Sequence, residues 1–155
     1  MTAEPTSELK IRIAAMDALA RREHSRRELE DKLLSRFGGQ PDTVKAVVDQ
    51  LQSEGLQSDD RYVESFCRYR IGRGQGPARI VSELRYKGIP PAHVSSALEA
   101  MEVDWFALAM DVCRRRFGET PASDQRDSAK RFRFLQYRGF TSDQIRHALA
   151  AGTSE

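Results

Sequence analysis

A repeated helix-ending motif constrains the fold of this chain more than any other feature of its sequence. In each copy a leucine is followed four residues later by a glycine and then by an apolar residue. Eight positions of one copy recur 51 residues further along: Leu84, Tyr86, Lys87, Gly88, Ile89, Val94, Ala97 and Leu98 match Leu135, Tyr137, Arg138, Gly139, Phe140, Ile145, Ala148 and Leu149. This order is typical of a Schellman stop, in which glycine ends the helix and the flanking apolar residues touch. Leu51, Gly55 and Leu56 form a third copy of the stop, so the chain is predicted to consist of tandem helical units.

Apolar residues spaced three and four apart run through the whole chain, whereas stretches that alternate apolar and polar residues are nearly absent. The first pattern favours helices, and the second would favour strands. The fold class is therefore predicted to be all-α. We expect about nine helices in three tandem three-helix repeats, in an elongated arrangement, with the repeats at 10–56, 59–101 and 103–151.

Capping residues place the ends of several of these helices. Ser25 and Glu28 have the spacing of a capping box, which predicts a helix that begins directly after Ser25. Thr141 and Gln144 have the same spacing and predict a helix near the end of the chain. For the first helix, the apolar spacing predicts a buried face that consists of Ile13, Met16, Leu19 and Ala20.

The basic side chains concentrate in the middle of the chain. Although the formal net charge is only +2, residues 61–88 hold seven Lys and Arg against two Asp and Glu. Most of these cations are arginines, whose planar guanidinium suits two-pronged contacts with carboxylate or phosphate. The segment is the predicted contact surface for an anionic partner, and a solvated charged face stays open as the alternative. The side chains predicted to make contact are Arg68, Arg70, Arg73, Arg79, Arg85 and Lys87.

Two basic runs in the last third of the chain are secondary candidates. Residues 114–116 are three arginines at the end of a predicted helix, where the helix dipole favours cations whether or not a partner binds. Lys130, Arg131 and Arg133 alternate with two phenylalanines in the middle of the next predicted helix, where the dipole offers no explanation. Contact with an anionic partner and a structural role both stay open there. Arg131 and Arg133 are added to the predicted contact residues.

No arrangement of residues typical of catalysis, metal binding or cofactor binding stands out. The three histidines are isolated and the two cysteines lack the spacing of metal ligands, so we predict no catalytic, metal or cofactor site and no small-molecule substrate. Cys67 and Cys113 are interpreted as reduced, small apolar side chains, with a disulfide as the alternative. The stretch 72–76 has the glycines of a phosphate loop but lacks its preceding strand and its Lys–Ser/Thr end. We interpret it as a flexible loop between helices.

The chain also lacks the sequence features of a membrane or secreted protein. No run of about 18 apolar residues could span a bilayer, and the first ten residues are polar, unlike a signal peptide. We therefore expect a cytoplasmic protein without membrane contact. We expect it to be a monomer.

Four groups of residues form a further pattern along the chain. They are 20–25 with Glu28, Leu29, Lys32 and Leu33; Gly55, Leu56, Asp59, Arg61 and Tyr62; 84–89; and Arg133, Phe134, Leu135, Arg138, Gly139 and Phe140. As a set they resemble the RecX family of bacterial regulators of the RecA recombinase, and the similarity covers the chain from about residue 13 to residue 149. The motifs are mainly caps, stops and core positions, so they do not mark contact residues.

The resemblance implies tandem three-helix repeats and a function without catalysis. Members of the family are understood to lodge in the groove of the RecA filament on single-stranded DNA. There they limit filament extension and dampen its ATPase, strand-exchange and co-protease activities, and some also bind DNA weakly. The implied partners are therefore RecA and its filament. A direct DNA-binding protein of homeodomain-like three-helix modules and a small hydrolase stay open as alternatives.

Overall fold

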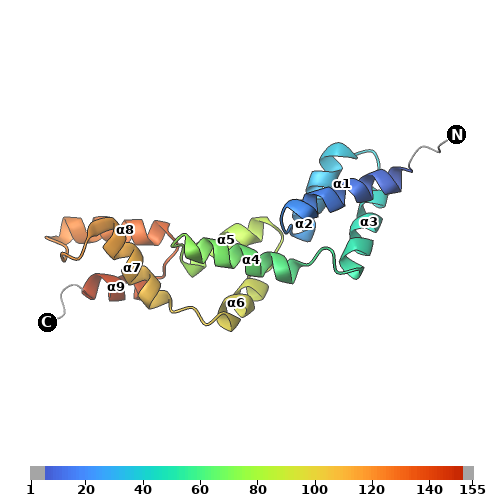
Figure 1. Cartoon of the computed structure of the whole chain (residues 1–155). Helices are drawn as coiled ribbons and strands as arrows, with labels where there is room; N and C mark the ends of the chain where they lie inside the picture. Colours follow the sequence, from blue (N-terminus) through green and yellow to red (C-terminus); the bar gives the residue numbers. More distant parts are fainter. Residues whose placement is uncertain (1–5, 152–155) are drawn as a thin grey trace. The chain divides into compact units, whose positions relative to one another are not determined.

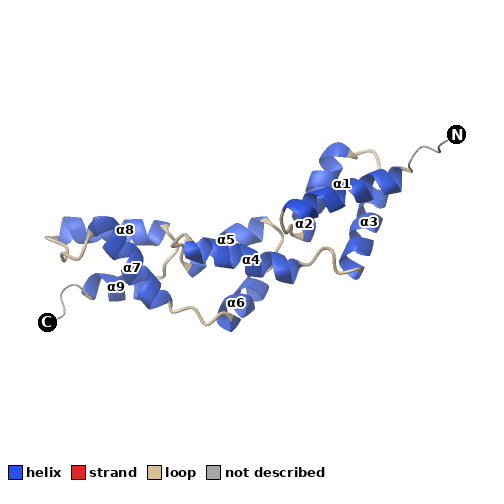
Figure 2. Ribbon diagram, viewed as in Figure 1, coloured by secondary structure: helices blue, strands red, loops and turns tan. Residues whose placement is uncertain are grey.

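The computed structural model describes residues 6–151, and in this part of the chain it consists of α-helices and loops without any strand (Figures 1 and 2). Residues 1–5 of the polar N-terminal stretch lie outside the described residues. The nine helices of the described part are α1 (Ser7–Arg21), α2 (Arg26–Arg36), α3 (Pro41–Ser53), α4 (Asp59–Gly72), α5 (Pro77–Tyr86), α6 (Pro91–Ala100), α7 (Trp105–Phe117), α8 (Gln125–Tyr137) and α9 (Ser142–Ala150). The all-α prediction is confirmed. None of these helices is both long and apolar enough to cross a membrane.

Contacts between residues divide the chain into two compact units. The first unit runs up to Ser65 and includes Tyr86–Ile89, and the second consists of Phe66–Arg85 and the chain from Pro90 onwards. We call α1–α3 the first module, α4–α6 the second and α7–α9 the third. The repeat boundaries predicted above stay a prediction.

The first module packs its three helices around one apolar core. The side chains in this core are Ile11, Ala15, Ala18, Leu29, Leu33, Val44, Val47, Val48 and Leu51. The predicted face of α1 is only partly right, because Leu19 packs against this core but the other predicted residues do not. Ile13 and Met16 are exposed, and Ile11 with two alanines faces the core instead. α1 carries apolar residues on two sides, so helical spacing alone cannot choose between them.

The third module has a core of its own, to which α7, α8 and α9 all contribute. Its buried side chains are Ala109, Val112, Cys113, Leu135, Phe140, Ile145 and Ala148. The predicted capping box at the start of α9 is present. The amide of Gln144 donates to the Thr141 hydroxyl at 3.3 Å, and the Thr141 amide donates to the Gln144 side chain at 2.9 Å.

The predicted helix stops are confirmed in their backbone geometry. Gly55, Gly88 and Gly139 all have left-handed φ angles, of 78°, 84° and 102°. After Gly139, the Phe140 amide donates to the carbonyl oxygen of Leu135 at 3.2 Å, which is the bond that defines a Schellman stop. The stretch 72–76 joins two helices, α4 and α5, as predicted, but its backbone is held by hydrogen bonds and is not a flexible loop. Gly74 has φ 79° there, and the Gln75 amide closes another such stop at the end of α4.

The stop after α8 also docks against the start of α5, within the second unit. The amide of Gly76 donates to the carbonyl oxygen of Arg138 at 2.8 Å, and the amide of Ala78 donates to that of Gly139 at 3.0 Å. A Cβ added to Gly139 would lie 2.7 Å from the Arg79 amide nitrogen, so only glycine allows this approach. The third module is thereby anchored on the first turn of α5.

The repeat of 51 residues places the same kind of contact, between a helix stop and the start of another helix, within the first unit. Ser25 and Lys87 correspond to Gly76 and Arg138, and the Ser25 hydroxyl donates to the Lys87 carbonyl oxygen at 2.8 Å. A Cβ on Gly88 would lie 2.8 Å from the Cβ of Arg27. Each unit therefore holds one stop that is docked on the start of a module's second helix. The conspicuous glycines of the repeat end helices and also permit these contacts.

Candidate partner-binding groove

Two of the predicted contact arginines meet on one carboxylate. Arg70 on α4 and Arg79 on α5 both pair with Glu83, at 3.1 Å and 2.9 Å. One glutamate cannot neutralise two arginines, so this cluster keeps a net positive charge. The shared carboxylate also holds the two helices together, because both of its oxygens are engaged.

Exposed tyrosines accompany these arginines. The Arg79 guanidinium lies over the ring of Tyr137, 5.1 Å from the ring centre, and the Arg73 guanidinium lies 5.9 Å from the centre of the Tyr69 ring. Tyr69 is 62% exposed and Tyr137 is 75% exposed. Arginine and tyrosine are enriched where protein surfaces bind partners, because they combine charge, hydrogen bonding and a large apolar area.

An open groove of about 450 Å³ runs beside Arg79 between α5 and the end of α8. It is lined by Ala78, Arg79, Ser82, Glu83, Gln136, Tyr137 and Gly139. We call it the Arg79 groove. Its position follows from the hydrogen bond between the Gly76 amide and the Arg138 carbonyl oxygen, which brings the end of α8 against α5.

The remaining predicted residues of the middle segment have different surroundings. Arg73 and Arg85 are exposed, and Arg68 is exposed on α4 with a partner of its own. Lys87 lies in the first unit and pairs with Glu28 at 3.3 Å. Burial raises the pKa of Glu28, but its bonds with Arg22 and Lys87 outweigh burial and lower that pKa overall. Lys87 thus helps to hold a structural carboxylate at the start of α2.

The secondary candidates on α8 separate into a buried and an exposed cation. Arg131 is only 8% exposed, and its guanidinium donates to the carbonyl oxygen of Thr120 at 2.9 Å and pairs with Asp127 at 3.3 Å. Arg133 is exposed. The structure therefore gives Arg131 a role inside the third module and leaves Arg133 at the surface.

Comparison with known proteins identifies the chain's relatives. Residues 58–98 match the model of the second three-helix domain of RecX, and residues 102–149 match that of the third. The regulatory protein RecX of Halorhodospira halophila (strain DSM 244 / SL1) is 47% identical over 145 residues, which cover 94% of this chain and 89% of the relative. This chain belongs to the RecX family. The regulatory protein RecX of Pseudomonas putida (strain GB-1) is 45% identical over 150 residues, covering 97% of this chain and 96% of the relative.

Solved RecX structures share the fold. The crystal structure of RecX from Lactobacillus salivarius has a TM-score of 0.79, with 24% sequence identity, over 94% of this chain and 96% of that one. A second crystal structure of regulatory protein RecX has a TM-score of 0.75 over 91% of this chain and 70% of that one, at 24% identity. The nine helices thus form the tandem three-helix modules of a family of regulatory proteins.

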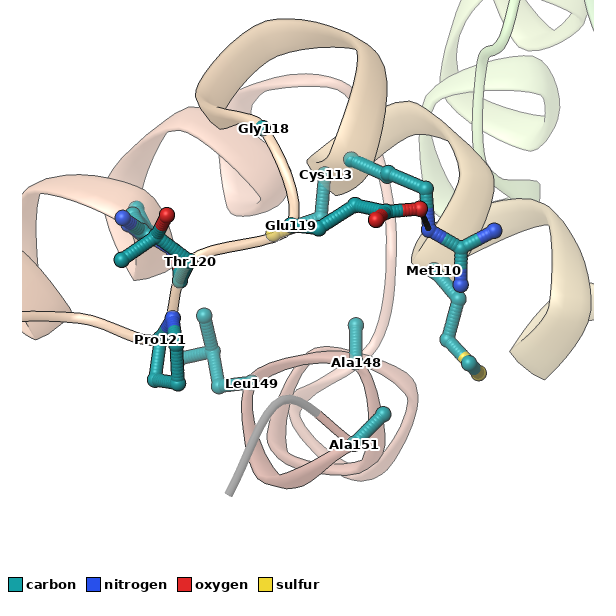
Figure 3. A pocket seen from close by; sticks show the side chains of 11 residues that line it. Met110, Cys113, Gly118, Glu119, Thr120, Pro121, Ala148, Leu149 and Ala151 are labelled. Atoms are coloured by element: carbon teal, nitrogen blue, oxygen red, sulfur yellow. Dashed lines mark hydrogen bonds and ion pairs between the residues drawn. The ribbon is translucent and has the colours of Figure 1, made fainter. Parts of the chain in front are cut away.

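The third module of this RecX chain contains a separate hollow of about 280 Å³ (Figure 3). Met110 and Cys113 border it from α7, Thr120 and Pro121 from the following loop, and Ala148 from α9. Burial raises the pKa of the Cys113 thiol, which keeps it protonated and a poor nucleophile. Both cysteines are free and buried, as the interpretation of reduced, apolar side chains predicted. In the described part of the chain, no group of three or more His, Cys, Asp or Glu is placed to hold a metal ion.

Sequence reasoning missed several residues that line the Arg79 groove or contact the predicted arginines. Tyr137 was recognised only as a position of the repeat, and Tyr69 carried no functional prediction. Arg138 was likewise recognised through the repeat, yet its guanidinium donates to the carbonyl oxygen of Arg73 at 2.8 Å and links the α4–α5 loop to the end of α8. The signal available in the sequence was the presence of tyrosines beside the arginines of residues 61–88 and beside Arg138.

Proposed function

We propose that this RecX chain binds the RecA recombinase and its filament on single-stranded DNA and modulates them without catalysis. The proposed effect is inhibitory: filament extension is limited, and ATPase, strand-exchange and co-protease activities fall. The observation that carries the proposal is 45–47% identity, over nearly the whole chain, to relatives named regulatory protein RecX. We further propose that it acts in the cytoplasm as a monomer, with repeats at 10–56, 59–101 and 103–151.

We propose the Arg79 groove and the exposed arginines around it as the contact surface. The predicted cations Arg68, Arg70, Arg73, Arg79 and Arg85 belong to the second unit, and two of them share one carboxylate. The surplus positive charge favours an acidic protein surface or a phosphate backbone. Tyr69 and Tyr137 add apolar area beside this charge. Arg133 is a further exposed cation of this unit, whereas Lys87 and Arg131 are engaged by Glu28 and Asp127.

The contact surface is best tested at arginines that do not support the fold. Reversal of Arg70 or Arg79 would place a second carboxylate beside Glu83, so it would disturb the α4–α5 contact as well as binding. Arg73→Glu combined with Arg85→Glu avoids this problem, because both side chains are exposed. We expect the double variant to lose affinity for the RecA filament on single-stranded DNA in a co-sedimentation assay.

A matched control separates a specific surface from overall charge. Arg126 is exposed at the start of α8 and lies outside the Arg79 groove. Arg126→Glu should keep filament binding close to wild type, although it also adds negative charge. The single variants Arg73→Glu and Arg85→Glu each add as much negative charge as Arg126→Glu. If all three lose the same affinity for the filament, the result argues against the proposed surface. Unchanged binding in the double variant would move the contact elsewhere.

Direct DNA binding is a second candidate function, because exposed tyrosines beside arginines also suit stacking against bases. A direct binder retains affinity for DNA when RecA is absent. Its affinity falls by roughly a thousandfold or more between 50 and 200 mM salt if it contacts six to ten phosphates. We expect the filament to be bound far more tightly than naked DNA at 200 mM salt. Equal affinities would favour the DNA-binding alternative.

A further inference from the structure

Three cations of the first module converge on a groove to which the proposed function assigns no role. Arg21 at the end of α1, with Lys32 and Arg36 on α2, lines a hollow of about 140 Å³, where Asp17 is the single carboxylate of the lining. All three cations are exposed. In the part of the chain that the structure describes, none of them pairs with a carboxylate. We call this site the α1–α2 groove.

Most arginines of the first unit have a carboxylate partner, but among its described residues Arg21, Arg27 and Arg36 do not, and two of these three lie in this groove. Four others are each bound to a carboxylate: Arg12 to Glu54, Arg22 to Glu28, Arg26 to Glu30 and Asp49, and Arg61 to Glu23. The helix dipole favours Arg21 and Arg36 in the last turns of their helices. It does not explain why Lys32 joins them in the same groove. The lining of this groove thus holds three cations against one carboxylate.

The floor of the α1–α2 groove is apolar. It consists of Ala14, Ala18 and Leu33, the last two being 3% exposed. At about 140 Å³ the hollow is smaller than the pockets that hold drug-sized ligands, which measure about 300–1,000 Å³. Its size therefore suits one side chain of a larger partner better than a whole metabolite. A partner segment complementary to this groove would have an apolar side chain for the floor and carboxylates on either side of it for the cationic rim.

The lining distinguishes a peptide from a nucleic acid. None of its residues is aromatic, so it offers no ring on which a base could stack. Asp17 repels phosphate and carboxylate groups alike, but a peptide can turn a backbone N–H donor towards it. We propose that the α1–α2 groove docks an acidic peptide segment of a partner protein, with an apolar side chain on Ala18 and Leu33 and carboxylates on Arg21, Lys32 and Arg36.

A fluorescent peptide tests the proposal on the full-length protein without RecA. The probe is twelve residues of Asp and Glu with one central leucine, and its anisotropy is followed as protein is added. We expect Lys32→Glu and Arg36→Glu each to weaken binding by about tenfold, because each reverses a charge at the rim. Lys45→Glu is the matched control: Lys45 is exposed on α3, outside this groove.

The outcomes separate this proposal from the proposed function. Replacement of the probe's leucine by serine should also weaken binding, and a thymidine oligonucleotide of equal charge should compete poorly. The proposal is overturned if Lys45→Glu weakens binding as much as Lys32→Glu, if the serine probe binds equally well, or if the oligonucleotide competes as strongly as unlabelled peptide. Far-ultraviolet circular dichroism confirms that each variant is folded. Loss of peptide binding with intact inhibition of RecA would leave the proposed function standing.

Discussion

Gly76 lies so close to Gly139 that a Cβ on Gly76 would overlap the carbonyl group of Gly139. The overlapping atoms are backbone, which cannot move aside as a flexible side chain would. The two glycines therefore allow the end of α8 to dock on the start of α5, and with it they shape the Arg79 groove.

Gly76→Ala should lower the stability of the protein. Overpacking of a tight contact costs about 1–3 kcal/mol, and here the backbone itself has to shift. Gly72→Ala is the control, because a Cβ on Gly72 meets nothing within 4 Å. We expect the melting temperature to fall for Gly76→Ala and to stay level or rise for Gly72→Ala. Equal melting temperatures for the two variants would show that Gly76 and Gly139 are not tightly packed.

Ser25→Ala should destabilise the first unit by more than an ordinary cap substitution. The Ser25 hydroxyl accepts from the Glu28 amide at 3.1 Å and donates to the Lys87 carbonyl oxygen at 2.8 Å. Loss of an N-cap costs about 1 kcal/mol, and the partly buried Lys87 carbonyl oxygen left without its partner adds up to about 1–3 kcal/mol. Thr6→Ala removes only an exposed cap from α1. A larger loss of the free energy of unfolding for Thr6→Ala would contradict the proposed role of Ser25.

Stability should decline in mild acid because of His24. Its side chain is 1% exposed, and burial lowers its pKa below the ordinary value of 6.5. Nδ1 donates to the Arg22 carbonyl oxygen at 3.0 Å, whereas Nε2 is buried without a partner, so the folded protein favours the neutral ring. Below pH 6.5 the His24 ring therefore binds a proton more readily in the unfolded chain than in the folded chain. The free energy of unfolding falls as the pH falls through 6.5.

The measurement is the melting temperature of the wild type and of His24→Asn at pH 7.5 and pH 5.5. Glu28 stays ionised at both values, because its pKa is lowered from 4.5. We expect the wild type to lose more stability than the variant between the two pH values, whatever their absolute stabilities. Parallel pH dependence would assign the effect to other groups.

The thiol of Cys67 should be nearly inert in the folded protein. Burial raises its pKa to about 11, so at pH 8 only about one thiol in a thousand is ionised. In a Cys113→Ala background, a thiol-reactive dye should label Cys67 slowly under native conditions and rapidly in denaturant. Fast native labelling would show that the helix around Cys67 opens readily.

Local signals of the sequence predicted much of the fold. The stops at Gly55, Gly88 and Gly139 depend on a left-handed glycine and its immediate neighbours, so they are visible in a short stretch of chain. The buried face of α1 depends on packing against other helices, and two apolar stripes made it ambiguous. The predicted core choice of Ile13 and Met16 was wrong for this reason.

The candidate site was less predictable, because its partners come from distant parts of the sequence. Charge density pointed to residues 61–88, but the sequence could not show that Arg70 and Arg79 share Glu83 or that Tyr137 lies beside them. The enclosure of Arg131 by Thr120 and Asp127 also depends on how the loop before α8 folds back. Such contacts require the arrangement of several helices.

Regulation of RecA by this chain is tested most directly through the single-stranded-DNA-dependent ATPase of the cognate RecA. The protein is titrated in at substoichiometric and then equimolar amounts. We expect the ATPase rate to fall already at substoichiometric ratios, because a protein that binds the filament and limits its extension acts on many subunits at once. An unchanged rate, together with salt-sensitive binding to DNA alone, would contradict filament regulation and favour a DNA-binding protein.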